Sequence, residues 1–463
     1  MNKHKKLIVF LGILLAVVLV VGGLLIWGNQ GTQEVTETHI DWYDPETKEF
    51  TLTTVEELYG LAILSEQYDF GGQTVRLGAD IALNSGDAAS WAKQPPVNVW
   101  MPVNGFAGIF DGQGHTISGV YAVGVNNSVG LFTDTKGSAK IQNLRLENSF
   151  IKGMSDKGTG SIIGSGAGVL ENIYSNAIVE CQSSNCGGLV GFMREGKTNL
   201  IQNCWFDGSV QGTNGTSSYV GGIVGRVLSN SGIPKIAHCL NTADVSAKSE
   251  YAGGFVGAVV GESSLWIVDS LSLGGVQANE GTAKVGMAVG SVFSQATLNL
   301  QTSWVAEGNY DSKVGETLGK VKGVCGTRSM DMLQDTAAYT YTTLDFDNYW
   351  AARKNETPVL QSFSQEKLSL ADVEKLIDVS WFDETATTLH IKDVAQFYGF
   401  QFLSQAYSFS GQILFLDADL TLNSGDAKTW EKNAPKYEWA PIGRHVDEAG
   451  KTIGVVFAGT FDG

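Results

Sequence analysis

The chain has 463 residues and a formal net charge of −17, with 43% hydrophobic and only 17% charged residues. This composition is too apolar for an intrinsically disordered chain and supplies enough side chains for a large core. The acidic balance excludes electrostatic binding to nucleic acid or to anionic lipid. The 57 glycines exceed the usual share of about 7%, which indicates a turn-rich β protein.

The N-terminus combines a basic flank with an apolar segment. Lys3, Lys5 and Lys6 precede 21 uncharged, mostly apolar residues at positions 7–27. This length suits a helix that spans a bilayer, and the basic flank predicts a cytoplasmic N-terminus. A cleaved signal peptide is the alternative, although no good small-x-small cleavage site follows. In both interpretations the rest of the chain is exported. If the segment is an uncleaved anchor, residues 7–27 contact the cell membrane.

A helix signal begins at residue 54. Thr54 and Glu57 have the spacing of a capping box, and Val55, Leu58 and Ala62 share one face. Unpaired strand edges at the end of a repeat array need a cover against aggregation. We therefore predict that this short helix caps the repeat region that follows.

Oxygen-bearing side chains cluster after this helix, and the cluster recurs later in the chain: Asp80, Asn84 and Asp87, then Asp419, Asn423 and Asp426. Calcium takes about six to eight oxygen ligands, so each cluster is a weak candidate calcium site. An Asx-rich turn is the interpretation that we favour. We expect no other cofactor or metal.

A glycine-framed word recurs through the middle of the chain, at residues 187–191, 221–225 and 253–257, with a decayed copy at 285–290. A second short block follows each copy, at 201–204, 236–239, 267–270 and 300–303. The interval between copies is about 27 to 35 residues. Such a period indicates stacked units that cannot fold alone.

The apolar runs in each unit are only three to five residues long, which predicts strands of a parallel β-helix. Each strand would pair with its counterparts one turn above and below, about 4.8 Å away. The flanking glycines suit corners that need a positive φ or a close backbone approach. In one core column we expect Leu189, Ile223 and Phe255, and in a second Cys204, Cys239, Ser270 and Ser303.

These blocks resemble the GLUG motif of bacterial surface proteins over roughly residues 104–310. The phrase at 106–117 looks like the usual opening of that family's β-helix, and residues 350–360 look like its exit strand. The resemblance implies an all-β, parallel β-helical fold. It leaves activity open, because the family includes adhesin-like proteins and relatives of IgA-cleaving metallopeptidases.

The five cysteines are Cys181, Cys186, Cys204, Cys239 and Cys325. Their odd number and the absence of CxxC pairs argue against a disulfide framework and against a zinc site. Cys204 and Cys239 are interpreted as stacked core thiols. A bridge between Cys181 and Cys186 across a loop is the minority interpretation.

A longer repeat relates residues 41–102 to residues 380–441 at a constant offset of 339. An insertion of 12 residues then precedes the second copy of the phrase at 106–112, which ends at residue 463. Asp393 and Gln396 repeat the helix cap. We expect a fragment of a longer protein with tandem modules. Its predicted parts are a transmembrane signal-anchor (1–30), a linker (31–39), a lead-in or capping segment (40–103), the repeat β-helix (104–361), a linker (362–378) and a truncated second module (379–463).

Catalytic signatures are sparse. A glycosidase needs two carboxylates about 5–10 Å apart, and the acidic residues that we place in the column of Asn203 are Asp269 and Glu171. A metallopeptidase helix needs two histidines four residues apart, and none of the six histidines has that spacing. We predict no enzyme activity and no catalytic residue in this segment. An acidic pair beside Lys or Arg in a groove would favour a glycan-degrading β-helix, and an HExxH beyond residue 463 would favour the stalk of a secreted peptidase.

Tryptophan supplies a weak candidate binding surface. Trp205, Trp266 and Trp304 lie beside ladder positions, and they would form a ligand-stacking strip if they line one outer face. Altogether the sequence predicts an exported, membrane-anchored cell-surface protein that serves as an adhesin-like or structural display stalk. Its extracellular C-terminal region would meet a glycan or protein ligand and no nucleic acid, and cleavage of the N-terminal segment would make it secreted or cell-wall bound.

Overall fold

The computed structural model describes residue 35 and residues 38–463, apart from segments at 183–184, 214–217, 249, 280–282, 309–311, 335–341, 354, 365–376, 424, 426, 431–438, 440, 444, 447–451 and 454. The predicted membrane segment at residues 7–27 lies outside the described residues. Within the described part of the chain, no helix is both long enough and apolar enough to cross a bilayer.

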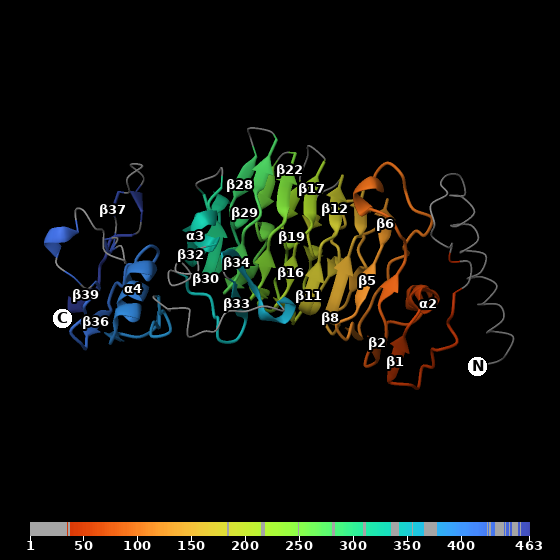
Figure 1. The fold of residues 1–463 in the computed structure, drawn as a ribbon, viewed down its shortest axis with the longest axis horizontal. Coiled ribbons are helices and arrows are strands. Elements are labelled where there is room, and N and C mark those ends of the chain that lie inside the picture. Colours follow the sequence, from red (N-terminus) through yellow and green to blue (C-terminus); the bar gives the residue numbers. More distant parts are fainter. Residues whose placement is uncertain are drawn as a thin grey trace.

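The described chain winds into a parallel β-solenoid of about seven turns (Figure 1). Sheet A contains β1 (Glu49–Leu52), β2 (Thr74–Leu77), β3 (Ile81–Ala82), β4 (Ile109–Asp111), β5 (Thr116–Ser118), β8 (Lys140–Glu147), β11 (Gly168–Ser175), β15 (Asn199–Gln202), β16 (Trp205–Phe206), β20 (Lys235–Ala237), β21 (Leu240–Asn241), β25 (Ser264–Val268), β26 (Leu271–Ser272), β30 (Thr297–Ala306) and β32 (Lys320–Arg328). The sheet thus begins inside the segment predicted as a lead-in.

Three further sheets complete each turn. Sheet B contains β7 (Phe132–Thr135), β10 (Ile163–Gly166), β14 (Val190–Met193), β19 (Val224–Val227), β24 (Val256–Val259), β29 (Val289–Val292) and β31 (Val314–Thr317). Sheet C contains β6 (Tyr121–Gly124), β9 (Phe150–Gly153), β12 (Ile178–Cys181), β17 (Ser209–Gly212), β22 (Asp244–Ala247) and β27 (Val276–Ala278). Sheet D contains β13 (Asn185–Gly187), β18 (Tyr219–Gly221), β23 (Tyr251–Gly253) and β28 (Lys284–Gly286).

Both predicted core columns are confirmed. The amide of Leu189 donates to the carbonyl of Ile223 at 3.1 Å, and the amide of Ile223 donates to Phe255 at 2.9 Å. All three side chains are fully buried. In the second column, the amide of Cys239 donates to Ser270 Oγ at 3.1 Å, and the amide of Ser270 donates to Ser303 Oγ at 3.2 Å. Burial, reinforced by the neighbouring Cys239, raises the pKa of the Cys204 thiol.

The glycine words mark close approaches. A Cβ on Gly188 would overlap the carbonyl oxygen of Gly222 in the next turn, although the φ of Gly188 is not positive. Positive φ values, between 43° and 54°, occur instead in a column at the corner within sheet A: Asn143, Asn172, Asn203, His238, Asp269 and Thr302. The placement of Glu171 in this column was wrong, because Glu171 pairs with Gln202 one position earlier.

Amide side chains link the first turns through this column. Asn143 Nδ2 donates to Asp111 Oδ1 at 3.0 Å, and Asn172 Nδ2 donates to Asn143 Oδ1 at 2.9 Å. Asn203 Nδ2 continues the ladder to Asn172 Oδ1. Asn tolerates the left-handed conformation and supplies both a donor and an acceptor, so one residue type satisfies the backbone and the ladder together.

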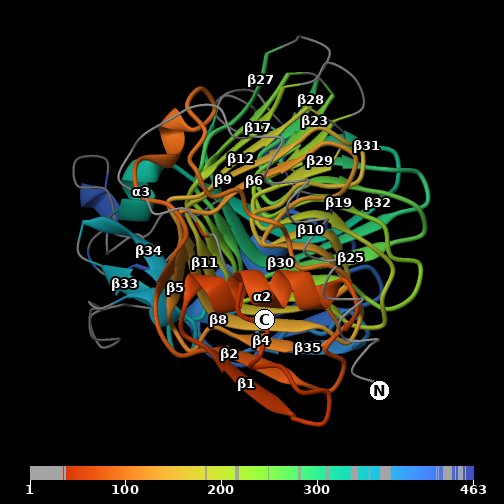
Figure 2. The same cartoon turned by 90° about the vertical axis from the view of Figure 1, so that its right-hand side faces the viewer.

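A helix lies at each end of the solenoid. Helix α2 (Val55–Ser65) has the predicted capping box and crosses the N-terminal end of the turns (Figure 2). Helix α4 (Val394–Leu403) lies beyond the C-terminal end (Figure 1), with Asp393 accepting from the amide of Gln396 at 2.8 Å. Tyr398 and Phe402 of α4 pack on the solenoid side, whereas Phe400 and Leu403 pack on the second copy.

A cover packs on the outside of sheet A. It consists of α3 (Met330–Gln334), the antiparallel hairpin of β33 (Trp350–Arg353) and β34 (Glu356–Leu360), and the 3₁₀ turn Gln361–Phe363. The second copy contributes a small parallel sheet of β35 (Thr388–Ile391), β36 (Ile413–Leu416) and β39 (Thr460–Asp462). Its insertion forms a hairpin of β37 (His445–Val446) and β38 (Thr452–Ile453).

The minority interpretation of Cys181 and Cys186 is confirmed. Cys181 and Cys186 form a disulfide between the end of β12 and the start of sheet D, and their Cα atoms are 5.9 Å apart. The change of direction from sheet C to sheet D brings the two residues within the range that a disulfide needs. Cys204, Cys239 and Cys325 are free and buried.

Candidate binding cleft

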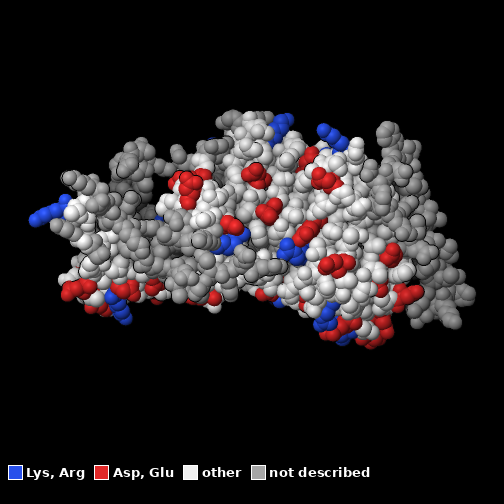
Figure 3. All heavy atoms as spheres, in the orientation of Figure 1, with Lys and Arg blue, Asp and Glu red and all other residues white. Residues whose placement is uncertain are grey.

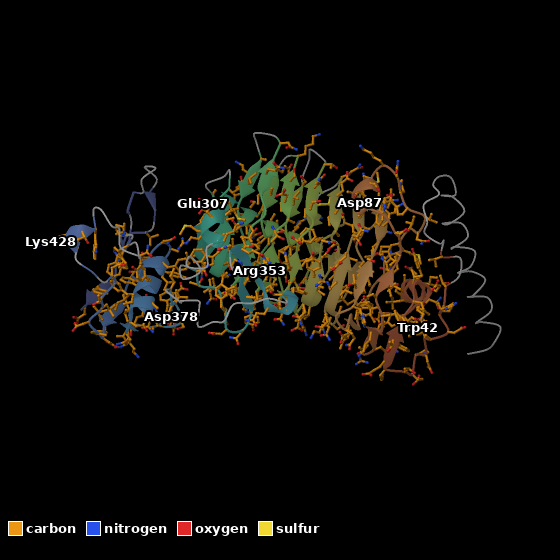
Figure 4. All side chains as sticks on the ribbon, viewed as in Figure 1. Trp42, Asp87, Glu307, Arg353, Asp378 and Lys428 are labelled. Atoms are coloured by element: carbon orange, nitrogen blue, oxygen red, sulfur yellow. A yellow bond between two sulfur atoms is a disulfide. The ribbon has the colours of Figure 1, made fainter. Side chains whose placement is uncertain are left out.

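The candidate calcium residues hold backbone turns. Asp80 Oδ1 accepts from the amide of Thr116 at 2.9 Å. The buried Asn84 donates through Nδ2 to the carbonyls of Asn98 and Gly119, at 2.7 and 2.9 Å. Asp87, at the N-terminal end of the solenoid in Figure 4, caps the 3₁₀ turn Ala88–Ser90. These contacts support the turn interpretation.

The second calcium cluster is only partly described. Asp419 is exposed, Asn423 is half-buried, and Asp426 lies outside the described residues. Across the residues that the structure describes, no three His, Cys, Asp or Glu side chains converge in a way that could hold a metal ion. Calcium binding therefore stays a prediction.

The proposed tryptophan strip does not form. Trp304 is fully buried, its Nε1 donates to Thr343 Oγ1 at 2.9 Å, and its ring stacks on Phe402 at 5.2 Å. Trp205 belongs to the same outward column and packs against Phe363 of the cover. The condition that the three rings line one exposed outer face is not met, because the cover and α4 pack over Trp304 and Trp205. Trp266 occupies another column and stays partly exposed.

A polar cluster fastens this cover to the ladder. Asp269 Oδ2 lies 2.9 Å from His238 Nδ1 and accepts from Trp350 Nε1 at 3.0 Å, and Tyr349 stacks on the His238 ring with centroids 3.4 Å apart. The amide of Asp345 donates to Asp269 Oδ1 at 3.2 Å. Burial raises the pKa of Asp269, although His238 opposes that shift. Because these contacts occupy both carboxylate oxygens, the cluster has a structural role.

A cleft of about 670 Å³ opens on the outer side of sheet B. Its floor is one outward column, in which Asp134, Ser165, Phe192 and Arg226 are successive cross-strand neighbours. Residues from four turns therefore meet there although they lie far apart in the sequence. Strands β10, β14 and β19 are paired on both sides, and β7, at the end of sheet B, is bridged on its outer side to Val103 and Phe106. The floor therefore offers little free backbone edge.

Arg226 is the most distinctive side chain of the cleft. Its guanidinium carbon lies 5.0 Å from the centroid of Phe192 and 5.4 Å from that of Tyr219. No carboxylate within the described residues forms an ion pair with Arg226, and its buried Nε has no hydrogen-bond partner there. By contrast, Arg194 in the same cleft is paired with Asp134. Arg226 thus packs against aromatic rings and has no counter-charge in an ion pair among the described residues.

Asn185 adds an unused acceptor to the same cleft. Its side chain is only 1% exposed, and its Nδ2 donates to the carbonyl of Asp156 at 2.7 Å. Its buried Oδ1 has no partner among the described residues. A buried polar atom without a partner costs about 1–3 kcal/mol, so such atoms are expected at sites that receive a ligand or water.

An aromatic surface continues from Arg226 toward later turns. Tyr219 and Tyr251 are register partners in sheet D, with ring centroids 5.4 Å apart and planes at 17°. Phe293 meets both rings edge-on, at 6.1 and 5.5 Å. These three half-buried rings lie next to Arg226 and outside the lining of the cleft.

The residues that flank the glycine words carried a sequence signal for this site. Phe192, Arg226, Ala258 and Ser291 each follow the last glycine of a repeat word and point outward. Asn185, Tyr219, Tyr251 and Lys284 each stand two positions before the first glycine of a word, in sheet D. The words predict the interior, whereas these flanking residues vary from turn to turn and include the cleft residues Asn185, Phe192 and Arg226.

Charge is unevenly distributed over the molecule. On the face shown in Figure 3, acidic side chains are scattered over the turns and gather along the lower edge at both ends, while basic side chains are fewer. The cleft differs, because Lys157, Arg194 and Arg226 line it together with Glu66, Asp134 and Asp156.

Comparison with known proteins supports the fold. No protein-family model matches the chain. The chain is 30% identical to halomucin of Haloquadratum walsbyi over 312 residues, which is 64% of this chain and only 3% of halomucin. A crystal structure from Bacteroides ovatus, described as a candidate immunoglobulin A1 protease, superposes with a TM-score of 0.52 at 19% identity, over 69% of this chain and 94% of that one. This chain is therefore a β-solenoid repeat protein, and the structural likeness carries the fold alone.

Proposed function

We propose that this protein is an exported, adhesin-like display stalk whose solenoid presents a ligand-binding cleft, and that residues 7–27 anchor it in the membrane. The observation that carries the proposal is the cleft over sheet B, where the unpaired Asn185 acceptor and the ring-held Arg226 converge on a rigid floor. Concave sites with a few convergent polar groups are the usual form of small-ligand sites.

Export is supported by three features. The Cys181–Cys186 disulfide suits an oxidising compartment outside the cytoplasm. The basic flank and apolar segment at the N-terminus suit a membrane-inserted start. The resemblance to GLUG-motif surface proteins and the similarity to halomucin agree with a repeat protein that works outside the cell.

The experiment is a binding screen of the full chain on glycan and protein arrays. Asn127→Trp places a bulky side chain at the exposed rim of the cleft, and Gln211→Trp places the same side chain on the outside of sheet C as a matched control. We expect saturable binding that Asn127→Trp abolishes and Gln211→Trp preserves, at equal thermal stability. Equal binding by both variants, or no ligand for the parent protein, would contradict the proposal.

A glycan-degrading enzyme is the second candidate, and one observation favours it. The cleft brings the carboxylates Glu66, Asp134 and Asp156 beside Arg194 and Lys157. Acidic side chains beside Lys or Arg in a groove are the arrangement expected of a glycan-degrading β-helix. Release of reducing ends from a bound glycan, lost in Asp134→Asn, would establish hydrolysis. Binding without product would leave the display function.

A further inference from the structure

The geometry points to a saccharide that carries a carboxylate as the ligand of the sheet B cleft, with Arg226 binding the carboxylate and Asn185 Oδ1 accepting from a sugar hydroxyl. This inference rests on the proposed binding function of the cleft and names the chemical class of its ligand. Three features of the site support it: the charge of Arg226, the hydrogen-bonding capacity of the walls, and the pairing of the strands.

The first feature is the charge of Arg226. The protein is strongly acidic, yet no described carboxylate forms an ion pair with this arginine. The guanidinium carbon lies over the rings of Phe192 and Tyr219. A guanidinium held in this way loses little conformational entropy when it binds a planar carboxylate through two parallel hydrogen bonds. An anionic group is therefore the chemistry that completes the site.

The second feature is the hydrogen-bonding capacity of the cleft walls, which suits hydroxyl groups. Short polar side chains line the cleft, including Asn104, Ser128, Thr133 and Ser165. The buried Asn185 Oδ1 needs a donor, which a carboxylate cannot provide and a sugar hydroxyl can. The ring of Phe192 adds a flat apolar face in the same space. One ligand must therefore combine a carboxylate, hydroxyl donors and an apolar ring face, as an acidic sugar does.

The third feature is the pairing of the strands beneath the cleft, which disfavours an acidic peptide as the ligand. An extended peptide binds most readily by adding a strand to an open sheet edge. Strands β10, β14 and β19 beneath the cleft each pair with a strand on both sides, so they expose no backbone groups to a peptide. Recognition here depends on side chains alone, which favours a saccharide.

The test measures binding of oligogalacturonate, sialyllactose, neutral lactose and an oligoglutamate peptide to the full chain by calorimetry. Arg226→Gln is the test variant. Arg145→Gln is the matched control, because Arg145 also stacks on a ring, that of Tyr174 at 4.3 Å, but lies on sheet A and is paired with Glu147. Circular dichroism and melting temperature confirm folding, and Arg226→Lys keeps the charge if Arg226→Gln fails to fold.

We expect at least one acidic saccharide to bind and to lose about tenfold or more in affinity in Arg226→Gln, since the lost contact is a charge-assisted hydrogen bond. Arg145→Gln should bind as the parent does, and the two acidic probes identify the carboxylate source. Tighter binding of lactose than of either acidic sugar, unaffected by Arg226→Gln, would overturn this inference and leave the binding function standing. Preferential binding of the peptide would overturn it in favour of a protein ligand. Failure of all probes, together with an empty array screen, would remove both proposals.

Discussion

The two copies of the long repeat show which structural features a solenoid turn forms by itself and which depend on packing against a neighbouring turn. Phe110 is fully buried in the first copy, whereas its counterpart Phe461 is 41% exposed. Trp100 is 2% exposed and Trp439 is 36% exposed. The first copy packs against later turns, since β4 pairs with β8, and the described second copy has only three parallel strands. Burial of these side chains thus comes from the next turn.

Local features behave differently, because they are complete in both copies. Thr54 caps α2 and Asp393 caps α4, each through a bond to the backbone of the third helical residue. Leu52 and its counterpart Ile391 are both fully buried between strand and helix. Helix caps and strand–helix contacts therefore form within one repeat, whereas the axial core requires stacking.

The largest contrast is expected from truncating the equivalent phenylalanines of the two copies, Phe110 and Phe461. Phe110→Ala should cost about 3–5 kcal/mol of unfolding free energy, since it leaves a cavity in a closely packed core. Phe461→Ala should cost less than about 1 kcal/mol, because the ring is already partly in solvent. Denaturant unfolding followed by tryptophan fluorescence measures both, and equal losses would break the comparison.

A smaller contrast is expected between the equivalent aspartates of the two copies, Asp111 and Asp462. Asp111 is buried and accepts from Gln113, Gln142 and Asn143, whereas its counterpart Asp462 is exposed. We expect Asp111→Ala to cost about 2–3 kcal/mol, because it leaves the donors of the ladder unpaired. Asp462→Ala should fall within about 0.5 kcal/mol of the parent protein. Chemical unfolding of the two variants gives the values.

The pH dependence sharpens this contrast. Burial opposes ionisation of Asp111, but the hydrogen bonds from Asn143, Gln113 and Gln142 hold its pKa below the usual range. Its stabilisation is therefore present above the unfolded pKa of about 3.9 and is lost as the pH falls through the folded pKa. The stability difference between Asp111→Ala and the parent protein should shrink below about pH 4. A difference that stays constant to pH 2 would contradict the assignment.

The smallest effects should come from the helix caps, and they should match. Thr54→Ala and Asp393→Ala each remove one side-chain bond to a helix amide and should each cost about 1 kcal/mol. Hydrogen exchange of α2 and α4 resolves the two losses separately. If Thr54→Ala lowers the protection of α2 but Asp393→Ala leaves that of α4 unchanged, the helix of the second copy does not depend on its cap as the first does.

The fold was predictable where a local pattern determines it. The repeat words specify the columns of Leu189 and Cys239 through their period, and the cap residues specify both helices. The cover over sheet A was not predictable in the same way, because it depends on contacts such as that between Trp350 and Asp269, 81 residues apart. Residues 350–360 were recognised as an exit strand, but not as a cover that buries Trp304, the candidate for an outer binding strip.

The cleft was predictable only in part: the repeat words align Phe192 with Arg226, but the other lining residues depend on the register of each turn. Asp134, Ser165, Phe192 and Arg226 become neighbours only through the exact number of residues in each turn, which varies. A shift of one residue in one turn would move a side chain from the outer face to the core. The site therefore follows from the register of the stacked turns.

The account depends on the register of the stacked turns, and a pair of engineered cysteines tests that register most directly. Ser209 and Asp244 are 35 residues apart and directly opposite in sheet C, so their Cα atoms should lie about 4.8 Å apart, within disulfide range. Ser246 lies on the same face but about 8 Å away, beyond that range. We predict that mild oxidation joins Ser209→Cys to Asp244→Cys almost completely and leaves Ser209→Cys with Ser246→Cys largely open. Equal cross-linking of both pairs, or preference for the second, would contradict the account.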